Sequence, residues 1–240
     1  MDVVAWLALW ERAVPQHPRG RRRELLAAAG LPSAHAADGL AIGRANAQLL
    51  RLHGALFGWH LPCHTACPRC GAALELDLDG EELLARDPDQ PAKPMELQVG
   101  DWEVFFRLPT EGDVDAVQEE RDLSAARAAL LQRCVTECRC GAGAASISLA
   151  PPEVSAHMGE RMEENDPLAT IEFELHCASC AHVWPSTLEV SDFLWTRLNA
   201  WAHRVLRDVH TLAKAYGWSE RTITEMSPWK RQLYLDMVEG

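Results

Sequence analysis

The chain has 240 residues, 48% of them hydrophobic, and a formal net charge of −12 at pH 7. This apolar content excludes disorder of the whole chain, and because no window of 18 apolar residues occurs, we exclude a membrane span. The first residues carry acids and no basic stretch, so we expect no signal peptide and a cytoplasmic protein. In such a reducing compartment, eight cysteines favour metal binding over disulfides.

Residues 1–62 are predicted to form a helical region. Apolar residues recur at helical spacing from Val3 to Val14, directly after Asp2, which is a suitable N-cap. A second short helix should end at Gly30. A third helix should run from about residue 43 to 57, with its leucines on one face.

Residues 63–190 are predicted to form a split zinc ribbon with an acidic α/β insertion at about 79–165. A strand should follow Cys70, because leucines alternate with acids from Leu74 to Leu78. A pair of strands should lie within residues 171–190, on either side of another cysteine turn.

The insertion shows its own local signals. Residues 87–94 form a proline-rich loop, and the alternating apolar residues that follow predict a hairpin with its turn at Gly100-Asp101. Thr110 and Asp113 resemble a capping box, which predicts the start of two helices before residue 134.

The acidic excess is confined to residues 75–122, which we call the acidic segment. It contains 16 acidic and four basic residues, and the rest of the chain contains 19 of each sign. This distribution argues against general affinity for nucleic acid. It fits either a solvated insertion or a surface that meets a basic partner.

Residues 191–240 are predicted to be helical again. Ser191-Asp192 should cap the longest helix, which runs to about Tyr216 and ends at Gly217, and two short helices should follow. The predicted fold class is therefore α+β, with helical N- and C-terminal parts around small antiparallel hairpins.

Two Cys-x-x-Cys motifs lie where strands are expected to turn. Zinc binds four thiolates in a tetrahedron, and each motif supplies two ligands from one tight loop, so we predict a site made by Cys67, Cys70, Cys177 and Cys180. Gly71 can adopt the positive φ that such a turn favours, whereas Ala181 at the equivalent place is less suited. A filled four-thiolate shell is structural, because it leaves no position for substrate.

Other ligand sets compete with this one. Cys138 and Cys140 could complete a site with Cys67 and Cys70, although their one-residue spacing fits a zinc turn less well. A second site could be formed by Cys63, Cys134, Cys138 and Cys140. A thiolate could also be replaced by one of the flanking histidines, His60, His64, His176 and His182.

No catalytic motif is present, so the sequence predicts a protein that is not an enzyme. Phosphate-binding glycine loops, zinc-protease helices, nucleophile elbows and dinucleotide fingerprints are all missing. His203, Asp208 and His210 share the long helix, where surface or core histidines are the simpler interpretation. From Arg197 to Arg231, seven basic residues face three acidic ones, which leaves a zinc-ribbon helix-turn-helix DNA-binding regulator as the alternative function.

The C-terminal part of the sequence resembles a phage-derived family, the baseplate hub assembly chaperones of T-even-type contractile phages and their relatives in contractile injection system loci. The helix-end pattern of that family is matched by Val209, His210, Leu212, Ala213, Tyr216 and Trp218. Its later positions are matched by Arg231, Tyr234 and Leu235, and its central motifs by residues 106–114 and 166–184. The start of the chain and the first cysteine pair look like the longer members, whereas Cys63, Cys138 and Cys140 depart from the pattern.

This resemblance implies a role in assembling a contractile tail or injection particle. The expected partners are baseplate or hub proteins, and no enzymatic activity is implied. The resemblance leaves open whether the protein departs after assembly, as a chaperone does, or is incorporated into the particle.

Overall fold

The structure is a computed structural model that describes residues 2–31, 34–87 and 94–239. These residues form helices and three small antiparallel sheets, so the mixed fold class is confirmed at that level. The proline-rich loop predicted at 87–94 lies almost wholly outside the described residues. None of the described helices combines the length and apolar character that crossing a bilayer requires.

Four helices form the N-terminal part: α1 (Val3–Ala13), α2 (Pro18–Ala28), α3 (Ala34–Asp38) and α4 (Ile42–Phe57). The predicted cap of α1 is confirmed, because the Asp2 carboxylate accepts hydrogen bonds from the backbone N–H groups of Val4 and Ala5. Pro18 occupies the first turn of α2, where its missing N–H costs no helical hydrogen bond.

The C-terminal part consists of α9 (Val190–Tyr216), α10 (Glu220–Thr224) and α11 (Pro228–Glu239). Helix α9 ends as predicted, since Gly217 adopts a left-handed conformation with φ of 70°. Its predicted cap is wrong. Glu189 takes the N-cap position without a capping side chain, and Asp192 lies inside the first turn, where its charge still suits the helix dipole.

Two hairpins carry the predicted cysteine turns. The first pairs β1 (His60–Ala66) with β2 (Ala73–Asp79), and the second pairs β7 (Glu172–His176) with β8 (Val183–Thr187). Strand β1 was not predicted, and it begins inside the region expected to be helical. A short helix, α5 (Gly80–Leu84), follows the first hairpin.

The insertion builds a separate small core. Its four-stranded sheet runs in the order β3 (Met95–Val99), β4 (Trp102–Phe106), β5 (Val135–Cys140) and β6 (Gly143–Ala144). The side chains of Val104 and Phe106 are fully buried there against Val154 and Met158. The helices are α6 (Glu111–Val117), α7 (Leu123–Cys134) and α8 (Pro152–Asn165), with one 3-10 turn at Ile147–Leu149. The hairpin and the Thr110–Asp113 capping box are confirmed, whereas β5 and β6 were not predicted.

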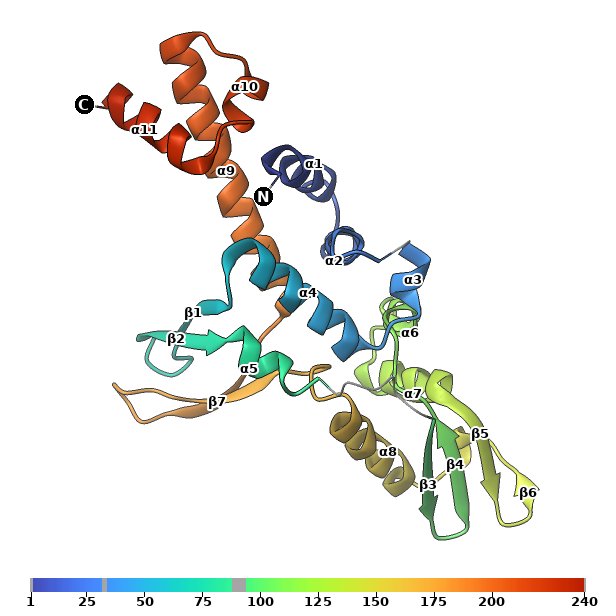
Figure 1. Ribbon diagram of the computed structural model, residues 1–240. Helices are drawn as coiled ribbons and strands as arrows, with labels where there is room; N and C mark the ends of the chain where they lie inside the picture. Colours follow the sequence, from blue (N-terminus) through green and yellow to red (C-terminus); the bar gives the residue numbers. More distant parts are fainter. Residues whose placement is uncertain (1, 32–33, 88–93, 240) are drawn as a thin grey trace.

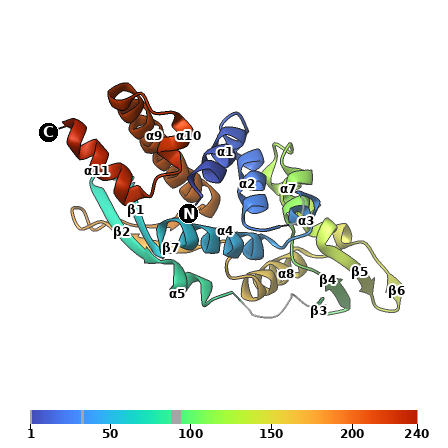
Figure 2. The same ribbon diagram turned by 45° about the horizontal axis from the view of Figure 1, so that its top comes forward.

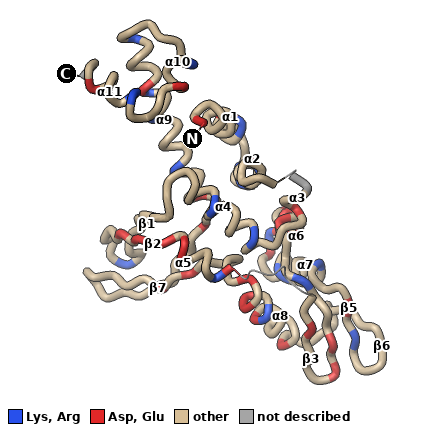
Figure 3. The backbone as a smooth tube through the Cα atoms, viewed as in Figure 1, with Lys and Arg blue, Asp and Glu red and all other residues tan. Residues whose placement is uncertain are grey.

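Part of the acidic segment is neutralised by arginines of other elements. Figure 3 shows acids along β2, α5 and α6, and also along α8, which follows the acidic segment. Glu111 pairs with Arg22, and Asp115 pairs with Arg19 and Arg23. Part of the acidity therefore holds the insertion against the N-terminal helices.

The largest core joins parts that are distant in sequence. Side chains of α2, α4 and α9 meet there, together with Leu61 of β1, Leu83 of α5 and Ile171. Figures 1 and 2 place α10 and α11, with the end of α9, and the β3–β6 sheet at opposite ends of an elongated molecule, with α4 and the start of α9 between them. The two cysteine hairpins lie beside this central helix.

Candidate metal centre

The two hairpin turns fold in the same way. In each turn, the N–H of the residue after the second cysteine donates to the carbonyl of the first cysteine, from Gly71 to Cys67 and from Ala181 to Cys177, both at 2.9 Å. The N–H groups of Cys67 and Cys177 donate to the residue five positions ahead, also at 2.9 Å. This repeated geometry directs both cysteines of each motif to the same side.

The turns require a left-handed residue at the same position. Gly71 has φ of 72° and Ala181 has φ of 54°, and among the described residues Ala181 is the one non-glycine with positive φ. A side chain in this conformation costs about 1–2 kcal/mol. The sequence-based expectation that Ala181 is the less suited of the two is therefore consistent with the structure.

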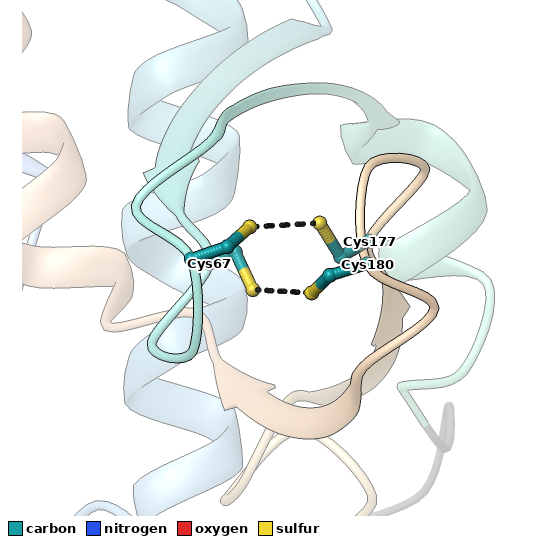
Figure 4. A group of neighbouring side chains, drawn as sticks. Cys67, Cys177 and Cys180 are labelled. Carbon is teal, nitrogen blue, oxygen red and sulfur yellow. Dashed lines mark hydrogen bonds between the residues drawn. The ribbon is translucent and has the colours of Figure 1, made fainter.

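The four predicted cysteines come together. Figure 4 shows the thiols of the two turns pointing toward one another, with Cys67 Sγ 3.7 Å from Cys180 Sγ and Cys70 Sγ 3.6 Å from Cys177 Sγ. All four sulfur atoms lie within 4.8 Å of one another. These separations are far longer than a disulfide bond of about 2.05 Å, so the four thiols form a group that could hold a metal ion.

The thiols influence one another's ionisation. Burial opposes ionisation of Cys177, but hydrogen bonds from the backbone N–H groups of Cys180 and Ser179 outweigh it and lower the pKa to about 6. The backbone N–H of His182 favours a Cys180 thiolate. However, burial and the neighbouring sulfurs oppose it more strongly and raise the pKa of Cys180 to about 12. A thiolate at one position thus disfavours a second, a repulsion that a bound cation removes.

The competing ligand sets are not formed. Among the described His, Cys, Asp and Glu side chains, this group of four is the one in which three or more potential ligand atoms cluster. Cys134 is fully buried at the end of α7, Cys138 faces the core of the insertion, and Cys140 is exposed on β5. These positions contradict both the Cys138/Cys140 assignment and the second site with Cys63.

The flanking histidines lie outside the cluster. His60, His64 and His176 are exposed on the hairpins, beside Asp77, Glu75 and Glu174 respectively. The ring of His182 stacks on Trp184 with centroids 5.7 Å apart. None of them takes the place of a thiolate in the arrangement that the structure describes.

The polar residues noted on the long helix also have other neighbours. The carboxylate of Asp208 pairs with the buried Arg231 of α11 at 3.2 Å, and the ring of His203 packs edge-on against Trp10. These contacts are structural, and His210 is exposed, which agrees with the simpler interpretation of these histidines as surface or core residues.

Sequence reasoning missed β1, the strand that leads into the first cysteine turn. Leu61, Cys63 and Thr65 do alternate inward, but Pro62 and His64 between them obscure the pattern. No protein-family model, curated protein or solved structure matches this chain.

Proposed function

We propose that this chain is a non-enzymatic zinc-binding protein that assists assembly of, or is a minor component of, the baseplate of a contractile phage tail or injection system. The observation that carries the proposal is the convergence of four thiols from two hairpins 107 residues apart. Such a cluster serves to hold distant parts of a chain together.

Zinc is the ion that fits this donor set. With zinc–sulfur bonds of about 2.3 Å, a regular tetrahedron has sulfur atoms about 3.8 Å apart. Two of the sulfur–sulfur separations, 3.6 and 3.7 Å, are close to that edge length. Two hairpins with matching turns around one ion constitute a split zinc ribbon.

The donor set favours a scaffold over a catalyst. Catalytic zinc keeps one position open for water or substrate, whereas four thiolates fill the tetrahedron. Zinc would then contribute free energy of folding and leave the chemistry of binding to other surfaces.

The last helix supports a protein partner. Helix α11 presents Trp229, Leu233 and Met237 at successive turns of one face, and the residues at either end of this row are 75% and 68% exposed. Large apolar side chains in a row at the surface are typical of a protein contact. This face is less suited to DNA, because a recognition helix needs basic and polar residues there.

The resemblance of residues 166–235 to the baseplate hub assembly chaperones supports the choice of partner. Baseplate proteins expose apolar surfaces before they reach their final neighbours, and a protein that binds these surfaces suppresses premature association by mass action.

The metal part of the proposal is tested by spectroscopy. A cobalt-substituted sample should show the thiolate charge-transfer bands of four sulfur ligands, and elemental analysis of the native protein should give one zinc per chain. A spectrum that indicates water or carboxylate ligands would contradict a closed four-thiolate site and favour a catalytic metal site instead.

The partner part is tested by co-purification with tagged baseplate and hub proteins from the same genome. We expect capture of at least one of them by the intact chain, and loss of capture by a Trp229→Asp/Met237→Asp variant. Leu123→Asp is the matched control, because Leu123 is 85% exposed in the insertion, at the other end of the molecule. Salt-sensitive binding of duplex DNA without capture of these proteins would favour the DNA-binding alternative.

A further inference from the structure

A groove lies between the two cysteine hairpins and the first turns of α9. It has a volume of about 610 Å³, within the range of ligand-binding sites. Its walls are the inward faces of the hairpins, with Leu76 and Leu78 on one side and Phe173 and Leu175 on the other. Phe193 of α9 contributes to the lining beside them.

The strand register explains why these walls are apolar. Cys63 is paired with Leu76 and Leu61 with Leu78, so the inward face of the first hairpin is apolar along its length. In the second hairpin, Phe173 is paired with Ser186, a small residue that leaves space opposite the ring. The alternate strand positions carry histidines and acids, of which His64 borders the groove.

The end of the groove at α9 is negatively charged. Glu189 and Asp192 both line it and are exposed, and neither forms an ion pair with any side chain that the structure describes. The guanidinium of Arg197, also in the lining, lies over the ring of Phe57, 5.6 Å from its centroid. Arg19 and Arg22 share a neighbouring hollow with the two carboxylates, but they are already paired with Asp115 and Glu111.

We propose that this groove binds a peptide segment of a partner protein, with an aliphatic or aromatic side chain between the hairpins and an adjacent Lys or Arg at Glu189 and Asp192. Charge complementarity selects this occupant, because the carboxylates lie next to apolar walls and attract a cation there. The inference rests on the proposed function in taking the partner to be a protein.

The metal centre and the groove are linked by the fold. The hairpins that form the walls are joined at their turns by the four cysteines and at their bases by the main core. Removing the metal releases the turns, so the walls lose their fixed separation. Peptide binding should therefore weaken when the metal is removed.

The probe is a synthetic library of random octapeptides, screened on the purified, zinc-loaded full-length protein. We expect the retained peptides to be enriched in Phe, Leu, Ile or Met next to Lys or Arg. The tightest peptide, fluorescently labelled, should bind with 1:1 stoichiometry by anisotropy, and its affinity should fall with added salt. Retention of no peptide, or of peptides without this apolar–basic pair, would overturn the inference.

Two pairs of variants locate the binding. Glu189→Gln/Asp192→Asn should weaken binding of the labelled peptide at least fivefold and reduce the salt dependence of that binding. Glu172→Gln/Glu174→Gln, on the outer face of β7, should change neither. Leu76→Gln should weaken binding at least tenfold, with Glu75→Gln on the outer face as its control. If each variant binds the peptide as tightly as its control does, the peptide binds outside the groove.

The thiol of Cys63 gives a second readout, because it lines the groove and is partly buried. Bound peptide should slow the alkylation of Cys63 by iodoacetamide and leave that of the exposed Cys140 unaffected. An unchanged rate of Cys63 alkylation would contradict binding in the groove. The outcome is separable from the assembly role. If the chain captures baseplate proteins but the groove binds no peptide, only the groove proposal is wrong. If the groove binds peptide but the chain captures no baseplate protein, only the assembly role is wrong.

Discussion

The carboxylate of Asp166 accepts a hydrogen bond from the backbone N–H of Gly43 at 2.9 Å, across 123 residues of sequence. The N-cap of helix α4 is Ala41, which has no side chain that can cap the helix, so Asp166 supplies the missing acceptor. Beside it, the amide of Asn46 donates to the carbonyl of Leu168 at 2.7 Å. These bonds fix the segment that leads into β7 against α4, and thereby place the second hairpin.

Gly43→Ala should destabilise the protein by about 1–3 kcal/mol, as overpacking at a tight contact does. A Cβ atom at this position would lie 1.8 Å from Asp166 Oδ1 and 2.9 Å from the backbone nitrogen of Ala169, so the capping contact must open. Urea unfolding monitored by circular dichroism measures the change. Gly39→Ala is the control, because its Cβ meets no atom within 4 Å. Equal midpoints for the two variants would show that the contact is dispensable.

Asp113 should make stability depend on acid pH. Burial opposes ionisation of this side chain, which is 3% exposed, but hydrogen bonds from Arg107 and Thr110 outweigh burial and lower its pKa to about 2. A carboxyl with a lowered pKa in the folded state stabilises the protein above its unfolded pKa of about 3.9, and this contribution is lost as the pH falls toward 2.

Asp113→Asn tests this directly. The variant should be about 1.5–3 kcal/mol less stable at pH 7, because hydrogen bonds to a charged group are weakened. The difference from the native chain should shrink as the pH is lowered from about 4 to 2, since the amide does not titrate. If the difference in free energy of unfolding between Asp113→Asn and the native chain stays constant over that pH range, the lowered pKa of Asp113 is contradicted.

Ala181→Gly should stabilise the zinc-loaded protein by about 0.5–1 kcal/mol. Glycine relieves the left-handed strain at φ of 54°, and part of the gain is offset by the greater freedom of glycine in the unfolded chain. The matched change, Gly71→Ala, should destabilise by about 1 kcal/mol, because it introduces the same strain in the first turn. Thermal unfolding of both variants is the measurement, and shifts of the same sign would rule out this explanation.

Cys177→Ser should lose the metal and unfold at lower denaturant, since metal affinity and folding free energy are the same quantity in such sites. Zinc-to-protein ratios by elemental analysis and unfolding by fluorescence are the readouts. Cys140→Ser is the control, because this exposed thiol on β5 lies outside the cluster. A Cys177→Ser protein that retains one zinc and melts like the native chain would require another ligand set.

The elements with a continuous periodic signal were predictable from the sequence. Helix α9 repeats apolar residues at one face from Leu194 to Leu212, so its period alone indicates a buried helix. The convergence of the four cysteines was also predictable, because zinc needs four donors and each motif offers two. Strand β1 was not, because its alternation is interrupted by Pro62 and covers too few residues.

The ion pairs of the acidic segment could not be predicted from the sequence, for a different reason. Whether Glu111 or Asp115 faces solvent or an arginine depends on how α6 lies against α2, a relation between helices some 90 residues apart. Composition reveals the number of charges and not their neighbours. The two cysteines of β5 show the same difficulty, since residues two apart face the same side of a strand, yet Cys138 is buried and Cys140, the last residue of the strand, is exposed.

The long separation of the two cysteine pairs also affects the order of events while the protein is being made. The first pair leaves the ribosome 107 residues before Cys177, a delay of about 5–20 s at ordinary rates of synthesis. During that interval Cys67 and Cys70 can offer an ion only half of its ligands. We therefore expect tight metal uptake to occur late, only after Cys177 and Cys180 have also left the ribosome, so that metal binding follows synthesis of the whole segment between the two cysteine pairs.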